Sequence, residues 1–290
     1  MGTLIVMAYP TTLFAKAADH TYVKCGTGNK AWACWGGKTG GKELRRGTGS
    51  TNRADKIAQP DEKAGIKCYL INGVCHQAAN RILLSAGITV RGARGYNVSE
   101  SLFGTYGRVG YWPCKSPFNK FPRTTGDLQE CVPKAVKGVR QTPLTRALSV
   151  ADKLDWQYIK GVLKIYEGAQ TMLKAKSFAP AEAEGFHIKL FMHMAEHHLG
   201  PMFDKKLASK LRQVRLKTEK NRLKAETAFE KDKMKAKEFV NAINKATIDF
   251  QDEMASAMTP EHYETLFELK PGDQVILADP SIVSEVFDVK

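Results

Sequence analysis

The sequence predicts an α+β fold, in which a small antiparallel sheet packs on a cysteine-bearing helix and a mostly α-helical domain with one long helix follows. Of the 24 glycines, 19 precede residue 140, as do all six cysteines. Glycine is typical of turns and weakens helix interiors, so the hairpins belong to the first half. Beyond Thr145 the apolar residues recur at the helical period. We therefore expect two domains, a basic α/β domain at 1–135 and a helical accessory domain at 136–290.

The N-terminal half opens with short extended segments. LIVMAYPTTLF, HTYVKC and KAWACWGG are separated by turn residues, which predicts a small meander of strands. The first segment ends in AKA, a small-residue pattern typical of a signal-peptidase site, but the basic region that precedes such a site is missing. We expect a strand there, and both a cytoplasmic and a secreted location stay open. Residues 36–53, rich in Gly and Arg, are expected to form a loop.

The next segment predicts a helix that starts at a cysteine. IKCYLI at 66–71 is a β-type run, and Asn72-Gly73 leads into HQAANRILLSAG, whose apolar residues have helical spacing and which stops at Gly87. Cys75 therefore lies at a helix N-terminus. A strand and turn over 88–98, a short helix with Ser99 as its N-cap and a linker at 110–143 are expected to follow.

The C-terminal half predicts three or more helices. The first starts near Thr145, the second covers 181–199, and a long one runs from about 201 to 258. Apolar stripes lie near the two ends of the long helix, whereas 215–234 is mostly charged. We expect both ends to pack, and the charged middle to project into solvent or to meet a protein partner. The tail KPGDQVILAD predicts a turn and a short strand.

The excess of positive charge lies in the first half of the chain. Residues 1–140 hold 21 of the 44 Lys and Arg but only 8 of the 30 Asp and Glu. Such a surface attracts anionic partners, although a solubilising surface explains it equally well. The basic run LRQVRLKTEKNRLK at 211–224 is typical of a solvated helix face, so nucleic acid is not an expected partner. No stretch is apolar for long enough to predict a transmembrane segment.

The chemistry that the sequence favours centres on Cys75. A thiol is a nucleophile only as the thiolate, and a helix N-terminus favours the thiolate through its free N–H groups and dipole. Only His20 and His76 in this domain could act as the base. His76 follows Cys75 directly, so its side chain points about 100° away around the helix. His20 is therefore the better partner.

The run YLINGVCHQAANRIL, at 69–83, resembles the nucleophile segment of circularly permuted papain-like thiol enzymes. This group contains the PPPDE deubiquitinating peptidases, the lecithin:retinol acyltransferase family and the permuted NlpC/P60 amidases. They share a Tyr- and Leu-containing approach strand, an Asn just before the Cys and another soon after, which here are Asn72 and Asn80. HTYV at 20–23 similarly resembles their His-bearing strand, which precedes the Cys in the permuted order. The likeness covers roughly residues 4–90.

The resemblance implies a cysteine-dependent peptidase, amidase or isopeptidase that attacks an amide or ester carbonyl without a cofactor. Cys75 would be the nucleophile and His20 the general base, while Asn72 would position the loop or add a hydrogen-bond donor. The substrate would be a peptide, peptidoglycan or another amide, and the basic domain favours an acidic one. The polar residue that orients the imidazole in these families has no counterpart at 31–35, so Asn29 or a backbone carbonyl would serve.

Two other sequence patterns are weaker evidence for a functional site. His193, Glu196 and His197 match H-x-x-E-H, which places two histidines on one helical face, but such patterns arise often in charged helices and no metal is expected. The six cysteines show no C-x-x-C pair, and their disulfide state stays open. They are Cys25, Cys34, Cys68, Cys75, Cys114 and Cys131.

A second hypothesis comes from a different class of protein. The chain would be a non-catalytic basic interaction protein, whose first domain binds an anionic polymer or membrane surface and whose helices mediate assembly. Cys75 would then be an inert buried thiol on a packed helix, which is common for free cysteine. The reactivity of Cys75 separates the two hypotheses.

Overall fold

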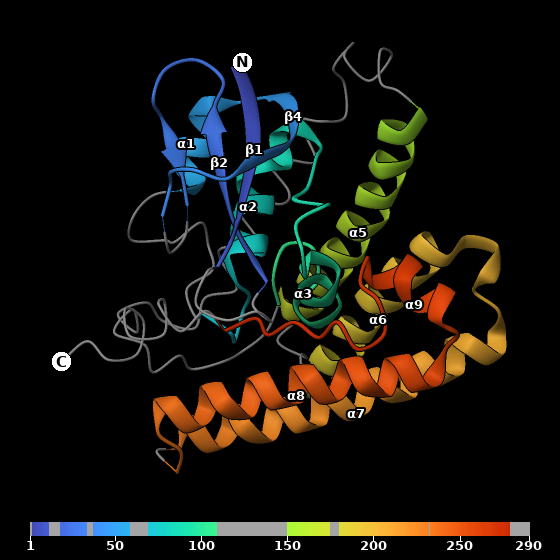
Figure 1. Ribbon diagram of the computed structural model, residues 1–290. Helices are drawn as coiled ribbons and strands as arrows, with labels where there is room; N and C mark the ends of the chain where they lie inside the picture. The colour runs from blue at the N-terminus through green and yellow to red at the C-terminus, as the bar shows by residue number, and fades with distance from the viewer. Residues whose placement is uncertain are drawn as a thin grey trace.

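The structure is a computed structural model with the α+β architecture that the sequence predicts: a small antiparallel sheet beside a larger set of helices (Figure 1). Elements keep the labels of Figure 1, and both termini of the described chain lie near the sheet side of the molecule. The residues that the structure describes are 2–11, 18–33, 37–58, 69–108, 150–174, 180–231 and 233–278.

Four strands form one antiparallel sheet in the order β3-β2-β1-β4. The central strand β1 alternates between buried and half-buried residues, the period-2 pattern of a strand with one face on the core. Leu4, Val6 and Ala8 form that inner face. The bounds are Gly2–Pro10 for β1, Asp19–Cys25 for β2, Ala31–Trp32 for β3 and Lys42–Gly49 for β4.

The helix α2, Cys75–Leu83, lies against β2 on the inner face of the sheet. All nine of its residues are buried, and Ala78 and Ile82 join the strand residues in the core. A short 3-10 turn, Leu84–Ala86, follows, and Gly87 closes it with φ of +67°, which glycine adopts without steric cost. The predicted helix and its glycine terminator are confirmed.

The loop expected at 36–53 is wrong, because Lys42–Gly49 pairs with β1 as an edge strand. Its Gly and Arg content is typical of a twisted, charged edge: the pairing shifts register at Val6/Met7, a bulge of the kind that bends edge strands. Ser50 then caps a short helix, α1 at Thr51–Ile57, by accepting a hydrogen bond from the N–H of Arg53.

Two other predictions in the first half need correction. Residues 69–73 form a tight turn in place of the end of a strand, with an isolated bridge between Tyr69 and Gly73. The helix α3, Tyr96–Phe103, begins at Gly95 and not at Ser99, because Gly95 has a left-handed φ of +78° that stops the preceding turn. The strand expected near 88 is also absent from the described residues 88–95, which form turns.

The second half is helical, as predicted. Five helices and one 3-10 turn occupy its described residues, and the C-terminal segment runs back past α3 toward the N-terminus of α2 (Figure 1). Their bounds are α5 Val150–Lys174, α6 Pro180–Leu199, η4 Gly200–Met202, α7 Lys205–Glu230, α8 Ala236–Ala257 and α9 Pro260–Phe267.

The single helix expected from 201 to 258 is wrong in its continuity, because it is an antiparallel hairpin of α7 and α8 (Figure 1). The chain turns between Glu230 and Ala236, and the rings of Phe229 and Phe239 stack with centroids 4.5 Å apart beside that turn. Folding back lets the two apolar stripes face each other, which a straight helix forbids.

One face of the charged middle of this stretch packs inside the protein, whereas the sequence predicts that the middle projects into solvent or meets a protein partner. Arg215, Glu219, Arg222 and Glu226 recur on one face of α7, and each is at most 3% exposed. They meet Arg108, which follows α3 in the first half. The ion pairs are Arg108–Glu219, Arg108–Glu226 at 2.5 Å, Arg215–Glu219 at 2.7 Å and Arg222–Glu226 at 3.6 Å.

This buried ion network, defined as those five residues, has an uneven balance of three guanidiniums and two carboxylates. Burial alone would raise the pKa of Glu219, but Arg108 and Arg215 hold it well below its usual range. Burial, together with the positive charge of Arg108, lowers the pKa of Arg222 to about 10. The guanidinium of Arg222 also stacks 4.4 Å from the ring centroid of Phe103, which stabilises a desolvated cation.

The apolar cores of the two halves are continuous, since one hydrophobic cluster extends from Leu4 to Ala278. The predicted domain boundary near residue 135 falls, like the linker at 110–143, outside the described residues and stays a prediction.

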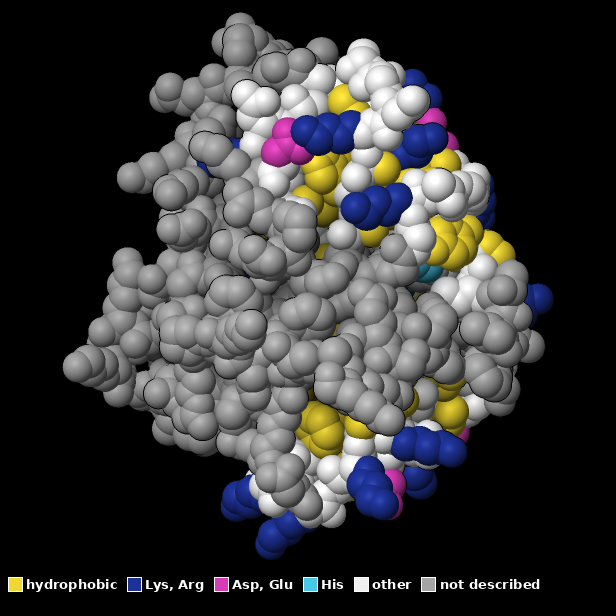
Figure 2. Space-filling view, turned by 90° about the vertical axis from the view of Figure 1, so that its left-hand side faces the viewer, with side chains coloured by type: hydrophobic (Ala, Val, Ile, Leu, Met, Phe, Trp, Pro, Cys, Tyr) yellow, Lys and Arg dark blue, Asp and Glu magenta, His cyan; other side chains and the backbone are white. Residues whose placement is uncertain are grey.

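Among the helices the structure describes, none is both long and apolar enough to cross a membrane. Figure 2 shows one face, with Lys and Arg side chains near its upper end and at its lower end.

The buried ion network predicts a large cost for removing one of its charges. We expect E219Q to lower the free energy of unfolding by about 3–5 kcal/mol, because Arg215 then keeps a desolvated charge without a carboxylate and Arg108 keeps only Glu226. The matched control is K217Q on the same helix, whose ion pair with Glu253 is exposed. It should cost no more than about 1 kcal/mol. Urea denaturation measures both, and equal losses would contradict a stabilising role for the network.

Candidate functional site

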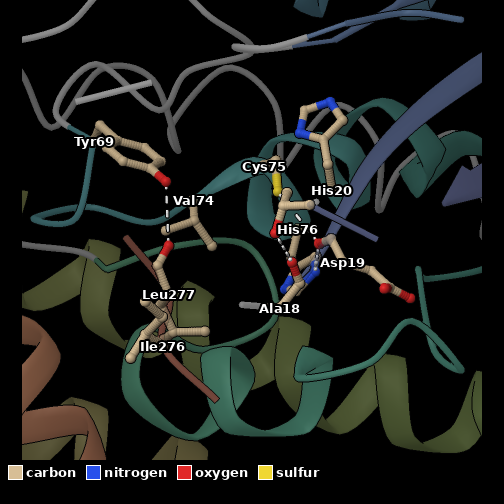
Figure 3. Close-up of a pocket in the computed structure, with 10 residues that line it drawn as sticks. Ala18, Asp19, His20, Tyr69, Val74, Cys75, His76, Ile276 and Leu277 are labelled. Atoms are coloured by element: carbon tan, nitrogen blue, oxygen red, sulfur yellow. Dashed lines mark hydrogen bonds between the residues drawn. The ribbon is translucent and has the colours of Figure 1, made fainter. Parts of the chain in front are cut away.

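Cys75 and His20 line the same small pocket, between the first turn of α2 and the start of β2 (Figure 3). In Figure 3 the Cys75 sulfur and the His20 ring both point into this space, whereas His76 points to the opposite side. The geometry thus brings together the two predicted residues. The full lining is Thr11, Ala18, Asp19, His20, Tyr69, Val74, Cys75, His76, Ile276 and Leu277.

The sheet fixes the orientation of His20. His20 lies opposite Tyr9 in the antiparallel pair of β2 and β1, and the two rings pack with centroids 4.9 Å apart. Its Nε2 lies 3.1 Å from the carbonyl oxygen of Gly37. Because a carbonyl only accepts hydrogen bonds, Nε2 carries the proton, and Nδ1 is the nitrogen that can take up another.

The Gly37 carbonyl fills the orienting role for which the sequence offers no side chain. Of the two alternatives left open, a backbone carbonyl and Asn29, the structure supplies the first, and Asn29 lies exposed in the turn after β2. The N–H of Gly37 in turn donates to the Tyr9 hydroxyl, 3.1 Å away. Tyr9 therefore contacts the imidazole and also holds the group that orients it.

Cys75 is the first residue of α2, as predicted. The side chain of Gln77 accepts a hydrogen bond from the N–H of Val74 at 3.1 Å, and this contact caps the N-terminus of the helix. The Cys75 sulfur lies 4.0 Å from the carbonyl oxygen of Asp19, the residue next to His20. Its side chain is buried, and Cys75 is only 8% exposed.

The turn before Cys75 is held by two arginines of the buried ion network. Three successive carbonyl oxygens accept hydrogen bonds from them. Leu70 O accepts from Arg222 Nη2 at 3.0 Å, Ile71 O from Arg108 Nη1 at 3.3 Å and Asn72 O from the Arg108 N–H at 2.6 Å. The network thus fixes the segment that leads into the helix.

Asn72 acts in the structure through its backbone. It is half-buried, and it is not among the described residues that line the pocket. Of the two roles the resemblance implies, the carbonyl contact with Arg108 supports positioning of the loop. Leu70 beside it has φ of +62°, a left-handed conformation that costs a non-glycine residue on the order of 1 kcal/mol.

His76 also borders the pocket, but its contacts are structural. Its Nε2 donates to the carbonyl oxygen of Asp19 at 2.9 Å, and its Nδ1 lies 2.7 Å from the Ser99 hydroxyl. Burial lowers the pKa of His76 to about 4, so the ring is neutral near pH 7 and Nδ1 accepts from Ser99. Both nitrogens are engaged, so His76 is a poor candidate for the base, as the sequence indicates.

Asn80, the second Asn of the resemblance, supports the helix from inside the core. Its amide donates to the Tyr96 hydroxyl and to the carbonyl of Thr105, and its carbonyl accepts from the N–H of Val90. One buried side chain thereby ties α2 to three segments. This role accounts for the residue without any part in chemistry.

The C-terminal segment completes the pocket, and nothing in the sequence indicates this. The Tyr69 hydroxyl donates to the carbonyl of Leu277 at 3.1 Å, and the Ala18 N–H donates to the carbonyl of Ile276 at 3.1 Å. Backbone pairing of this kind leaves no residue pattern. No local signal marks Arg108 or Arg222 as buried either, because Arg222 stands in a charged run and Arg108 stands alone between Gly107 and Val109.

A wider, polar cleft adjoins the pocket and shares Asp19 with it. The Asp19 carboxylate accepts a hydrogen bond from the N–H of Arg94 at 3.0 Å, so this residue forms the wall between the two spaces. Cations and anions both line the cleft. Its charged residues are Asp19, Lys42, Arg94, Glu264, Glu268, Lys270 and Asp273.

The H-x-x-E-H pattern on α6 forms an aromatic cluster. His193 and His197 stack on the ring of Tyr158, with centroids 5.2 Å and 4.5 Å away. Within the described part of the chain, no group of three or more His, Cys, Asp or Glu could hold a metal ion. Cys25 and Cys75 are buried thiols, while Cys34, Cys68, Cys114 and Cys131 lie outside the described residues.

Comparisons of the chain with family models, with curated proteins and with solved structures returned no match. The resemblance at residues 4–90 therefore depends on the quoted motifs.

The neutral state of His76 predicts an acid-sensitive fold. Its pKa is about 4 in the folded chain and about 6.5 when unfolded, so between these values only the unfolded chain binds the proton. Stability due to this residue is complete above pH 6.5 and falls as the pH drops toward 4, by on the order of 3 kcal/mol. We expect H76Q to lose this part of the pH dependence.

Urea denaturation at several pH values between 7.5 and 4 measures the effect. The control variant is H262Q, on α9 and away from the pocket, which should keep the acid-induced loss. A parallel loss in H76Q and the wild type would contradict the assignment.

Proposed function

We propose that this protein is a cysteine-dependent hydrolase that cleaves an amide or ester bond, with Cys75 as nucleophile and His20 as general base. The observation that carries the proposal is their shared pocket, where a thiol at a helix N-terminus meets an imidazole whose tautomer is set by the Gly37 carbonyl. A nucleophile, a base and a group that orients the base are the elements of thiol catalysis.

In the proposed reaction the Cys75 sulfur attacks the substrate carbonyl carbon while its proton passes to Nδ1 of His20. The oxyanion that forms is stabilised by N–H groups at the first turn of α2, which the helix does not use for its own hydrogen bonds. The imidazolium then gives its proton to the leaving amine or alcohol, and a thioester remains. Water attacks the thioester as His20 accepts its proton, which releases the acid and restores the thiol.

The surroundings favour a polar amide substrate, such as a peptide or peptidoglycan. The cleft behind Asp19 carries both charges, so it suits a chain with both acidic and basic groups. Within this proposal Asn72 is a positioning residue, because its carbonyl helps to fix the turn before Cys75.

The proposal predicts that Cys75 reacts with iodoacetamide at least about tenfold faster than Cys25 near neutral pH, because a paired imidazole raises the thiolate fraction. Cys25 is a suitable internal comparison, since the two residues are 9% and 8% exposed. Hydrogen bonds from the Thr27 backbone and hydroxyl lower the pKa of Cys25, so the comparison is stringent. Peptide mass spectrometry over a time course gives both rates.

The variant H20A should slow labelling of Cys75 by about tenfold or more while Cys25 keeps its rate. H262A serves as the control for loss of a histidine elsewhere. Equal labelling of the two thiols, or a rate in H20A equal to that of the wild type, would remove the hydrolase proposal. The non-catalytic interaction protein would then be the better hypothesis.

A further inference from the structure

The outward face of α7 carries a row of lysines with no acidic residue among them. Lys206, Lys210, Lys217, Lys220 and Lys224 are all exposed, and we call them the lysine stripe. At about 100° per residue they fall within a sector about 80° wide, opposite the buried face of the helix. At about 1.5 Å per residue, the row extends for about 27 Å.

The exposed face of α7 has an excess of positive charge because the acidic residues of this segment lie on the buried face. The acidic residues Glu219 and Glu226 are at most 3% exposed and pair with buried arginines. They therefore do not compensate the outward lysines. In the described part of the chain, the only ion pair that the lysine stripe makes is Lys217 with Glu253, at 2.7 Å.

The sequence alone favours a solvated helix face at 211–224, but it does not show that Glu219 and Glu226 are buried. With that charge sorting in place, we propose that the lysine stripe binds the sugar–phosphate backbone of nucleic acid without reading its sequence. Nucleic acid presents a fixed negative charge about every 3.4 Å along each strand, so a straight row of lysines can contact several phosphates at once. Lysine acts as a point charge toward phosphate and imposes no bidentate geometry. The stripe lacks aromatic or arginine side chains that would read bases.

Two observations favour a narrow polyanion over a membrane surface. The positions between the lysines hold the polar residues Ser209, Gln213 and Asn221, so the stripe offers no apolar side chain for insertion between lipids. The stripe is also one helix wide, because Glu253 on the neighbouring α8 borders it. A flat anionic surface would have to approach that carboxylate, whereas a single backbone can follow the lysines alone.

The test measures binding of the full-length protein to a fluorescein-labelled 24-bp DNA duplex and to a 24-nucleotide RNA, by anisotropy at 50–200 mM NaCl. The quadruple variant K206Q/K210Q/K220Q/K224Q should bind at least about 30-fold more weakly at 50 mM NaCl. The slope of log Kd against log salt should also fall, by about 3.6 on the duplex and about 2.8 on the RNA, because each of the four lost phosphate contacts contributes about 0.9 on duplex DNA and about 0.7 on a single strand.

The matched control is K164Q/K189Q/K237Q/K270Q, which removes the same charge from exposed lysines outside the stripe. It should change the affinity by less than about threefold. Circular dichroism and the unfolding midpoint confirm that both variants fold. Equal losses in the two variants would overturn the proposal, since net charge would then be the cause.

Binding to vesicles with 30% phosphatidylserine tests the other anionic partner, a membrane surface. Binding to vesicles without binding to either nucleic acid would overturn the proposal, as would the absence of binding to DNA and RNA at 50 mM NaCl. The variant C75A should bind nucleic acid as the wild type does. Its result separates this surface from the proposed hydrolase, because loss of the thiol leaves the lysine stripe intact.

Discussion

The buried ion network around Arg108 is the constraint on which the rest of the structure depends. Removing a charge from water costs several kcal/mol per ion, and the cost is offset only when every charged group finds partners of good geometry. Three guanidiniums and two carboxylates leave donors to satisfy, and the backbone before Cys75 supplies an acceptor for one donor of Arg108 and for one of Arg222. The carbonyl of Leu70 accepts from Arg222, which is 152 residues away in the sequence.

The proposed nucleophile and the proposed base are consequently held by different parts of the fold. The turn at 70–72 is fixed by Arg222 of α7 in the helical half, and by Arg108, which pairs with the acidic residues of α7. His20 is fixed from the sheet, through Tyr9 and the Gly37 carbonyl. The strained φ of Leu70 persists because these contacts determine its conformation. In the proposed reaction such a site would need little rearrangement, which is how preorganisation lowers a barrier.

The sequence predicts the elements whose signals lie within a few residues of each other. The helix that starts at Cys75 and ends at Gly87 has its apolar period and its terminator within a few residues, and β1 has its alternation. The placement of His20 beside the same pocket followed from the motif order. The edge strand β4 was mistaken for a loop because its glycines and arginines are equally typical of both, and only pairing with β1 decides between them.

Local sequence signals do not predict which charged residues of α7 are buried and which are exposed. A run of Lys, Arg and Glu predicts a solvated helix face, since isolated charges are seldom buried. Here Arg215, Glu219, Arg222 and Glu226 are buried because Arg108, more than 100 residues earlier, lies opposite them. The turn between α7 and α8 was missed because a continuous helix satisfies the same local period. The contact between Phe229 and Phe239 beside the turn joins residues of two helices and exists only after folding.

The two faces of α7 therefore follow from one arrangement of charge. Glu219 and Glu226 satisfy the arginines that fix the turn before Cys75, and this leaves the lysines opposite them uncompensated. An acidic residue on the outward face would balance those lysines without touching the network. Conversely, exchanging Glu219 and Lys220 would keep the composition and the net charge but would place a lysine beside Arg108 and Arg215. Net charge is therefore a poor guide to this helix, because the position of each charge around its axis decides what it does.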